Sequence, residues 1–419
     1  MNATSPEREA IAAGRPVRRF LIAGHVHAES GDDFEERLAE AYRGQERPLC
    51  LCREPGVPMY VARVGAQFVI KRMPLSGGDH ESSCPSHEPP YDLSGLGPLM
   101  GTAIKLDAAA GTAALKLDFA LSKRGAAHNA EVNGDQSDSV KSEGKRLSLR
   151  ALLHLLWQEA GLTQWTVNWT GKRHWWHVHH HLLEASRTMT VRGEMLSERL
   201  FVPERFRAEA RDMIEQRRSR ALAGLIGSGG GAKKLMLLVG EIKEFAAARS
   251  GQQVIVKHMP GFRLHLEETA WGRLQRRFEP ELALWRSDDR FHLMAIATIE
   301  VNPAGIVVIN EIAIMTVTEQ WLPIENAHEE RLLNRLMRMR GKTVKGLRFN
   351  LAAGQPIANV VLPEAKPRPV GLYIVPPNAD EQFDASLRDM IDMRPDMAAW
   401  IWRVAEGEMP AMPWEQELT

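Results

Sequence analysis

The chain has 419 residues, of which 44% are hydrophobic and 25% are charged, a composition typical of globular proteins and not of disordered ones. A chain of this length exceeds one ordinary hydrophobic core, so we expect two or three domains. Its 53 basic residues are balanced by 53 acidic ones. The overall charge therefore does not indicate nucleic acid or an anionic membrane as a partner, and any such evidence must come from local patches.

The first 122 residues predict a β-rich domain. A strand at 20–23 and a helix at 33–42 precede two alternating segments, 59–63 and 67–71, that predict a hairpin. Two more strand-like pieces follow near 103–106 and 114–121. From 123 to 145 the chain is polar with almost no large apolar residue, which predicts a flexible linker.

Residues 146–227 predict a helical domain. Ser148 is a suitable N-cap for a helix at 149–160, and Gly161 is a suitable stop. Further helices are expected at 175–187 and after Pro203. Three helices with short connections resemble a helix-turn-helix or winged-helix unit, although plain helical bundles share this pattern.

Residues 228–419 predict a mixed α/β domain. Strands are expected at 235–239, 254–257, 262–266, 291–299, 306–317, 343–349, 357–362 and 370–375. Asn326 and Glu329 form a capping-box-like pair before a helix at 327–340, and the end of the chain is expected to be helical. The sequence therefore predicts an α+β protein of several domains, with residues 1–122, 146–227 and 228–419 as the domains and residues 123–145 as a linker.

The three cysteines of the chain, Cys50, Cys52 and Cys84, all lie in one short segment. An odd, sparse count of this kind does not form a disulfide framework and indicates metal binding in a reducing compartment. No apolar run approaches the roughly 18 residues that cross a bilayer, and the stretch at 20–24 is too short for a signal peptide. We therefore expect a cytoplasmic protein with no membrane partner.

The strongest motif is Cys50-x-Cys52, the hairpin, and then His80-x3-Cys84-x2-His87. Structural zinc takes four tetrahedral nitrogen or sulfur ligands from two short clusters bridged by a small fold. Three thiols need one histidine to complete the shell, with His80 as the first choice and His87 as the alternative. A complete protein shell leaves no position for a catalytic water, so we expect a structural zinc knuckle. The alternative is three buried cysteines that lie together without a metal.

Two basic segments are candidates for nucleic-acid contact. In the first, Lys172 and Arg173 would contact phosphate and Trp175 would stack on a base, and the alternative is a solvated helix face packed through its tryptophans. His177 and His181 in the same segment have a metal-capable i, i+4 spacing, but no carboxylate or cysteine lies near them in the sequence. The second is the densest basic run of the chain, with no acid between its ends, and it comprises Arg331, Arg335, Arg338, Arg340, Lys342, Lys345 and Arg348. It would follow a nucleic-acid backbone, and a solvated face is the alternative.

An enzyme remains the alternative hypothesis. Glu241-Ile242-Lys243 has the Glu-x-Lys spacing of metal-dependent nucleases, in which a strand places both side chains on one face. An ion pair at the end of a strand explains the same residues. The segment at 227–234 superficially resembles a phosphate loop, but it lacks the glycine before the lysine and the Ser or Thr after it.

Several stretches together resemble a bacterial family, the "eleven-seventy-three" domain of unknown function, over about residues 48–405. They are CLCREPGVPMYVAR, KRMP, DHESSCPSHEPP, LRALLHLLWQEAGL, GEIKE, ERLLNRLMRMRGK, LRFN and LYIVPP. The resemblance implies a gene near plasmids or integrating mobile elements, and it implies no fold, activity or catalytic residue. It also implies cysteines at the positions of Cys52 and Cys84, and often a tyrosine at that of His87, which favours His80 as the fourth ligand.

The element order over residues 322–375 also resembles the PD-(D/E)xK nuclease fold of competence CoiA-like proteins. Where that family has its metal-binding aspartate, this chain has Asn359, and where it has Glu-x-Lys, this chain has Leu372-Tyr373-Ile374. The resemblance therefore implies a degenerate, catalytically silent version of the fold, with Glu329 as a capping residue. The resulting hypothesis is a zinc-containing, non-catalytic accessory protein of a mobile element that acts with DNA or with other proteins of the element. A metal-dependent nuclease and a protein-only scaffold remain the alternatives.

Overall fold

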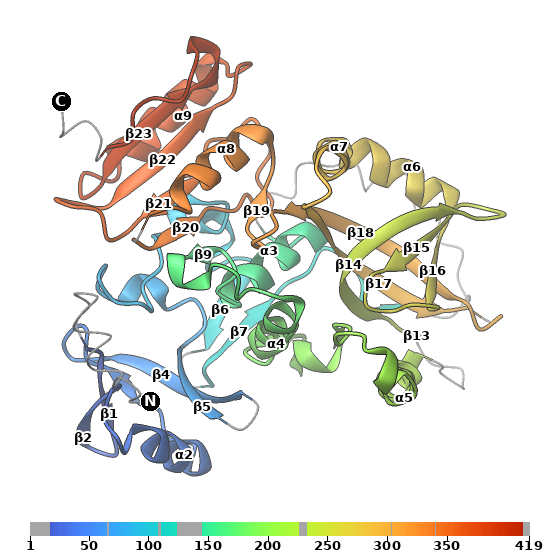
Figure 1. The fold of residues 1–419 in the computed structure, drawn as a ribbon, viewed down its shortest axis with the longest axis horizontal. Coiled ribbons are helices and arrows are strands. Elements are labelled where there is room, and N and C mark those ends of the chain that lie inside the picture. The colour runs from blue at the N-terminus through green and yellow to red at the C-terminus, as the bar shows by residue number, and fades with distance from the viewer. Residues whose placement is uncertain are drawn as a thin grey trace. The chain divides into compact units, whose positions relative to one another are not determined.

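The structure is a computed structural model that describes residues 17–64, 67–107, 110–123, 145–225, 233–302, 304–339 and 341–413. In these ranges it has eight α-helices, α2 to α9, and several β-sheets, so the predicted mixed α+β class is confirmed (Figure 1). The predicted linker lies outside the described residues except for its two ends, Lys123 and Lys145. None of the helices in the described ranges has both the length and the apolar character that crossing a lipid bilayer requires.

The chain forms two compact units. Unit 1 comprises residues 1–90 and 108–112, and unit 2 comprises residues 91–107 and 113–419. The predicted boundaries near residues 122 and 227 both fall inside unit 2.

Unit 1 is built on a five-stranded sheet of order β2-β1-β3-β4-β5. Its strands are β1 (Arg19–Ile22), β2 (His25–Ala28), β3 (Leu49–Cys50), β4 (Val57–Val64) and β5 (Gln67–Arg72), and its helix is α2 (Phe34–Gly44). Strands β4 and β5 pair antiparallel, as the alternating segments predicted. A small core of Phe20, Phe34, Leu38, Met59 and their neighbours includes the side chains of Cys50 and Cys84, so the cysteine segment belongs to the core of this unit.

The segment predicted to be a helical domain contains helices and short strands. Helix α3 (Leu149–Glu159) begins at Ser148, whose hydroxyl accepts the N–H of Ala151 at 3.1 Å, as predicted. Helices α4 (Trp175–Ser186) and α5 (Arg211–Leu222) follow. Strands β9 (Gln164–Trp165), β10 (Met189–Val191), β11 (Glu194–Met195) and β12 (Leu200–Phe201) interrupt them. Strands β10 and β11 form a second sheet with β6 (Ile104–Asp107) and β7 (Thr112–Leu115).

The largest sheet of unit 2 closes on itself. Its long strands are β14 (Met236–Ala247), β15 (Gln252–Val256), β16 (Arg263–Leu266), β17 (His292–Val301) and β18 (Val307–Val317). The order is β14-β15-β16-β18-β17, and β17 pairs again with β14 (Figure 1). Helices α6 (Glu268–Arg277) and α7 (Glu279–Ser287), which we did not expect from the sequence, lie between β16 and β17 and pack on β18. The result is a small closed barrel.

The last sheet has the order β23-β22-β21-β20-β9. Helix α8 (Ala327–Leu336) begins at the predicted cap Asn326, whose Oδ1 accepts two backbone N–H groups, and β20 (Thr343–Lys345), β21 (Val360–Leu362) and β22 (Val370–Val375) follow it. The end of the chain is only partly helical, because α9 (Glu381–Asp392) is followed by β23 (Ala398–Arg403), which lies parallel to β22. The indole N–H groups of Trp400 and Trp402 donate to Ala411 O and Gly407 O and so hold the end of the chain.

Candidate functional site

The structure brings together four of the five candidate zinc ligands, Cys50, Cys52, His80 and Cys84, in unit 1. One ligand atom from each of the four lies within 4.8 Å of all the others. The Sγ atoms of Cys50 and Cys84 are 3.8 Å apart, and His80 Nδ1 lies 3.3 Å from Cys52 Sγ and 3.6 Å from Cys84 Sγ. Bonds of about 2.3 Å from zinc to sulfur and about 2.0 Å to nitrogen place tetrahedral ligands about 3.6–3.8 Å apart. The cluster therefore has the ligand types and the spacing of a Cys3His zinc site.

The ligands come from two short segments that the sheet and a buried ion pair hold together. Cys50 ends β3, where it pairs with Phe20 and Val57. His80 and Cys84 lie in the loop after β5, and Glu88 closes this loop by donating its N–H to Gly77 O and by accepting Arg72 Nη2 at 2.5 Å. Position 77 requires glycine, because a Cβ there would lie 2.5 Å from the Cβ of Glu88.

Three of the four ligands are shielded from solvent, with 1% of Cys50, 2% of His80 and 4% of Cys84 exposed, while Cys52 is partly exposed. His87, the alternative ligand, is placed differently, because its Nδ1 lies 3.0 Å from the carbonyl oxygen of His80. His87 thus supports the loop that carries a ligand. A set of four protein ligands, three of them buried, fits a structural metal ion and leaves no open position for a substrate.

One thiol of the cluster is prepared to act as a metal ligand. The hydrogen bond from Cys50 and the neighbouring ring of His80 lower the pKa of the Cys84 thiol to about 3, although burial opposes this shift. The same contact with Cys84, together with burial, raises the pKa of Cys50. Metals bind thiolates, so the lowered pKa of Cys84 favours its form as a metal ligand.

The first basic segment needs correction, because two of its three candidate residues are buried. Arg173 donates to the carbonyl oxygens of Leu162 and Gln164, and Trp175 donates through Nε1 to Pro203 O at 2.9 Å. Both side chains fasten α4 to its surroundings and cannot reach a phosphate or a base. Lys172 is exposed, and the exposed indole of this helix belongs to Trp176, of which 48% is accessible. Among the described residues, the cysteine–histidine cluster is the only close group of potential metal ligands, so the histidines of α4 form no such group.

The second basic segment divides into an exposed half and a buried half. On α8 and just after it, Arg331, Arg335 and Arg338 are exposed, whereas Lys342 and Lys345 are only 5% and 3% exposed. Arg340 lies outside the described residues. The second half, Lys342, Lys345 and Arg348, therefore does not form a surface for phosphate. Only the exposed arginines on α8 and just after it are placed where a nucleic-acid backbone could reach them.

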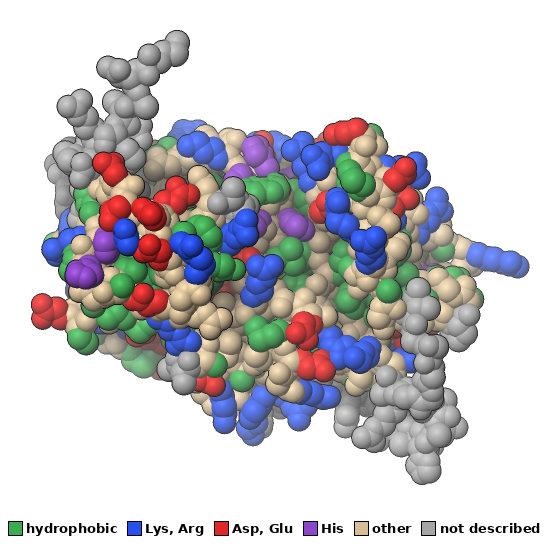
Figure 2. All heavy atoms as spheres, turned by 90° about the horizontal axis from the view of Figure 1, so that it is seen from below, with side chains coloured by type: hydrophobic (Ala, Val, Ile, Leu, Met, Phe, Trp, Pro, Cys, Tyr) green, Lys and Arg blue, Asp and Glu red, His purple; other side chains and the backbone are tan. Residues whose placement is uncertain are grey.

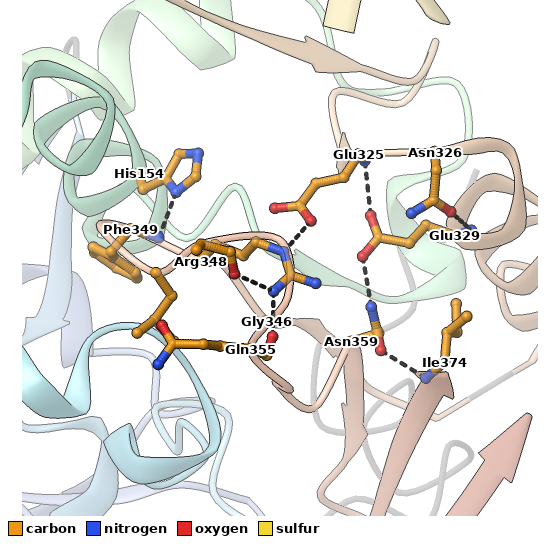
Figure 3. A network of polar contacts seen from close by, with 12 residues as sticks. His154, Glu325, Asn326, Glu329, Gly346, Arg348, Phe349, Gln355, Asn359 and Ile374 are labelled. Atoms are coloured by element: carbon orange, nitrogen blue, oxygen red, sulfur yellow. Dashed lines mark hydrogen bonds and ion pairs between the residues drawn. The ribbon is translucent and has the colours of Figure 1, made fainter. Parts of the chain in front are cut away.

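Arg348 belongs to a polar network with Glu325 and Glu329 (Figure 3), and Lys345 joins this network through Glu329. Glu329 Oε1 accepts Lys345 Nζ at 2.9 Å and Asn359 Nδ2 at 2.7 Å, while its Oε2 accepts the N–H of Glu325 at 2.8 Å. Asn359 Oδ1 in turn accepts the N–H of Ile374. Glu329 is therefore more than the helix cap that we expected.

Arg348 extends this network on its other side. Its guanidinium pairs with Glu325 and donates to the carbonyl oxygens of Ala352 and Gln355. Burial, which alone would favour the neutral acid, is outweighed by Arg348 and Lys345, so the pKa of Glu325 is lowered. Each charge of the network faces an opposite charge, which indicates a structural role for these basic residues.

The candidate nuclease pair is separated in the barrel. Glu241 is 3% exposed, whereas Lys243 is exposed. The pairing of β14 with β15 shifts register between Ile242 and Glu244, so a bulge at Lys243 breaks the alternation on which the prediction rested. The buried carboxylate is already engaged, since its Oε1 lies 2.7 Å from both Lys257 Nζ and His292 Nδ1.

Rings flank this carboxylate on both sides. The ring of His292 stacks on Trp321 with centroids 4.1 Å apart, and that of His258 stacks on Trp175 at 4.7 Å. Burial would raise the pKa of Glu241, but contacts with His258, His292 and Lys257 outweigh it and lower the pKa to about 2. Glu241 thus stays ionised and connects β14 with the segment after β15, through Lys257 and His258, and with β17, through His292.

The stability of unit 2 is expected to depend on the ionisation of Glu241. A carboxyl group with a pKa of about 2 when folded and about 4.3 when unfolded stabilises the fold above pH 4.3, and this contribution is lost as the pH falls towards 2. The difference in unfolding free energy between the wild type and Glu241→Gln should therefore shrink by about 3 kcal/mol between pH 5 and pH 2. Denaturant titrations followed by tryptophan fluorescence measure this difference. A difference that stays constant over this range would contradict the assignment.

Comparison with known proteins identifies the family of the chain. No curated protein and no solved structure matches it, so the resemblance to PD-(D/E)xK nucleases gains no support. The model of one family, described as "Protein of unknown function (DUF1173)", matches residues 20–405. This match spans the cysteine–histidine cluster, the barrel and the sheet beside α8, and the chain therefore belongs to the DUF1173 family.

Proposed function

We propose that this chain is a zinc-containing, non-catalytic protein that associates with nucleic acid. The observation that carries the nucleic-acid part is a row of exposed arginines, the arginine stripe, formed by Arg331 and Arg335 of α8 and by Arg338 in the turn that follows it. The spacing of four residues places Arg331 and Arg335 on one side of the helix, and exposed guanidinium groups of this kind suit a phosphate backbone.

The zinc part of the proposal is supported by the geometry of Cys50, Cys52, His80 and Cys84. A metal with four protein ligands would stabilise a unit that has only a small hydrophobic core. Its role would be to hold unit 1 in shape, with no step of a reaction assigned to it.

The protein has a net charge of zero and therefore no general attraction to polyanions, so any contact with nucleic acid must come from a local group of basic residues. Figure 2 shows that Lys and Arg side chains lie in several groups on one face of the molecule, interspersed with carboxylates. A setting in plasmids or integrating mobile elements remains what the family resemblance implies. A nuclease that uses Glu241 and Lys243 has less support, because one side chain is buried in ion pairs and the other is exposed.

Removing two charges of the arginine stripe is expected to weaken binding to both duplex and single-stranded DNA. In Arg335→Ala/Arg338→Ala, the slope of log K against log salt for duplex DNA should become shallower by about 1.8, because each phosphate contact contributes about 0.9. Filter binding at salt concentrations between about 50 and 200 mM measures this slope.

The matched control removes two exposed arginines of α6 and α7, in Arg276→Ala/Arg286→Ala, which changes the net charge equally. The control should bind as the wild type does. If the wild type binds neither form of DNA at low salt, the nucleic-acid part of the proposal is wrong, and stoichiometric zinc alone would favour a protein-only scaffold.

A further inference from the structure

The barrel of unit 2 has an uncommon pairing pattern. Strand β14 pairs through its first half with β17, from Met236 to Ile242, and through its second half with β15, from Ile242 to Ala247. Strand β15 pairs antiparallel with β16, and β17 with β18. The barrel closes through a parallel pairing of β16 with β18, in which His265 lies opposite Val308.

Numbered along the chain from one to five, these strands have the cyclic order 1-2-3-5-4-1, with one parallel pair between strands three and five. The bulge in the first strand lets it serve both halves of the barrel. Between strands three and four, α6 packs on the barrel, with Trp271 against Phe245 at 4.8 Å. This strand order, the bulged first strand and the position of the helix are those of the OB fold, whose second and third strands form a binding face.

The outer face of β15 and β16 has the composition of a binding surface. Val254, Val256, Leu264 and Leu266 are buried in the barrel. The side chains that alternate with them, at Gln253, Ile255, Arg263 and His265, are accessible to solvent. These four residues are cross-strand neighbours, because Ile255 lies opposite Arg263 and Gln253 lies opposite His265. Arg263 donates to Gln253 Oε1 at 2.9 Å, which fixes its position on the face.

Basic residues lie on and beside these strands. Arg263 lies on β16 and Arg249 lies beside the strands, whereas the nearby Lys257 is paired with Glu241. Arg249 lies in the loop that joins β14 to β15, at one end of the face, and is exposed. At the β18 side, Ile306 is an apolar side chain with 50% of its surface exposed. The face therefore combines cations for phosphates with apolar side chains and one imidazole ring for bases.

We propose that the face formed by β15 and β16 is a binding site for single-stranded nucleic acid. Arg249 and Arg263 would contact successive phosphates, and unpaired bases would lie against Ile255 and His265. In a duplex the bases are stacked inside the helix, so only the unpaired bases of a single strand can contact the apolar side chains of this face. This inference rests on the proposed association with nucleic acid and adds the form of the ligand and its site.

The test compares Arg249→Ala/Arg263→Ala with the control Arg276→Ala/Arg286→Ala, which removes two exposed arginines from the helices of the same barrel. The probes are a fluorescently labelled oligothymidylate and a duplex of equal length, measured by anisotropy on the full chain. The face variant should bind the single strand about tenfold more weakly, with a salt slope shallower by about 1.4, because each phosphate contact on a single strand contributes about 0.7. The control should match the wild type.

A second variant, Ile255→Ala, tests the base contact separately. It should weaken single-strand binding without changing the salt slope, because it removes no charge. Circular dichroism of each variant checks that the barrel remains folded.

The outcomes separate this inference from the proposed function. If the wild type binds DNA but the face variant binds the single strand as tightly as the control does, the barrel site is wrong and the association stands. A wild type that prefers the duplex would also overturn the site. If the wild type binds neither probe, both proposals fall together.

Discussion

Replacing Cys84 by serine is expected to abolish stoichiometric zinc binding and to unfold unit 1. The thiolate of Cys84 lies within ligand distance of Cys50 and His80, and three remaining ligands hold zinc far more weakly than four. Structural zinc in small domains contributes about 10–16 kcal/mol, which exceeds what the small core of unit 1 can replace. We expect about one zinc per wild-type chain and much less than one in the variant, measured by atomic absorption.

The same experiment can distinguish the two units optically. All eleven tryptophans of the chain lie at position 157 or later, and thus outside unit 1. Chelation or Cys84→Ser should therefore make unit 1 sensitive to protease while the tryptophan fluorescence of unit 2 stays native-like.

Two histidine variants test the zinc prediction further, His80→Ala as a second ligand variant and His87→Ala as the matched control. His80→Ala should lose zinc, whereas His87→Ala should keep it, because His87 Nδ1 lies 3.0 Å from the carbonyl oxygen of His80 and His87 does not belong to the four-ligand cluster. Zinc that survives in Cys84→Ser, or a loss confined to His87→Ala, would show that the ligand set is wrong. If the wild-type protein contains no zinc, the three cysteines are core residues and not metal ligands.

Replacing Lys345 by methionine is expected to destabilise unit 2 by about 3–5 kcal/mol. Its ammonium group and the Glu329 carboxylate are each 1% exposed, so the substitution leaves a negative charge buried without its main partner. The double variant Lys345→Met/Glu329→Gln should recover part of this loss, because neither charge then remains. Denaturant titration followed by tryptophan fluorescence measures the three unfolding free energies.

The control for this prediction is Arg335→Ala on the exposed side of the same helix, where a change within about 0.5 kcal/mol is expected. If Lys345→Met lowers the unfolding free energy no more than this control does, the buried ion pair of Lys345 and Glu329 does not stabilise unit 2.

The features that the sequence predicted best depend on local spacing. The ligand pattern from Cys50 to Cys84 follows from the number of residues between donors, and the caps Ser148 and Asn326 follow from neighbouring residues. The β4–β5 hairpin follows from alternation over a few positions. Each of these needs only contacts within one segment, and for that reason sequence reasoning could find them.

The basic residues show what local spacing cannot supply. Lys345 is neutralised by Glu329, which precedes it by sixteen residues, and Arg173 is satisfied by carbonyl groups of a neighbouring loop. A count of charges along the chain cannot tell which of them the tertiary fold will bury. The one signal that was available is the apolar environment of Lys342 and Lys345, in the strand-forming segment around Val344.

The barrel was missed for a related reason. Its five strands were predicted as separate elements, but closure depends on the pairing of β14 with β17 and of β16 with β18, which are distant in the sequence. The helices α6 and α7 begin with acidic residues and end with arginines, a capping pattern that would have revealed them.

The pairing of β9 with β20 has a consequence for synthesis on the ribosome. Gln164 of β9 lies opposite Val344, and Arg150 of α3 donates to the carbonyl oxygens of Phe349 and Leu351. Helix α3 packs on α4, β17 and β18, but β9 and Arg150 must wait for a segment that is translated nearly two hundred residues later. Such late closure exposes apolar surface on the nascent chain, so a fragment that stops before residue 340 would leave β9 without its partner strand and accessible to chaperones.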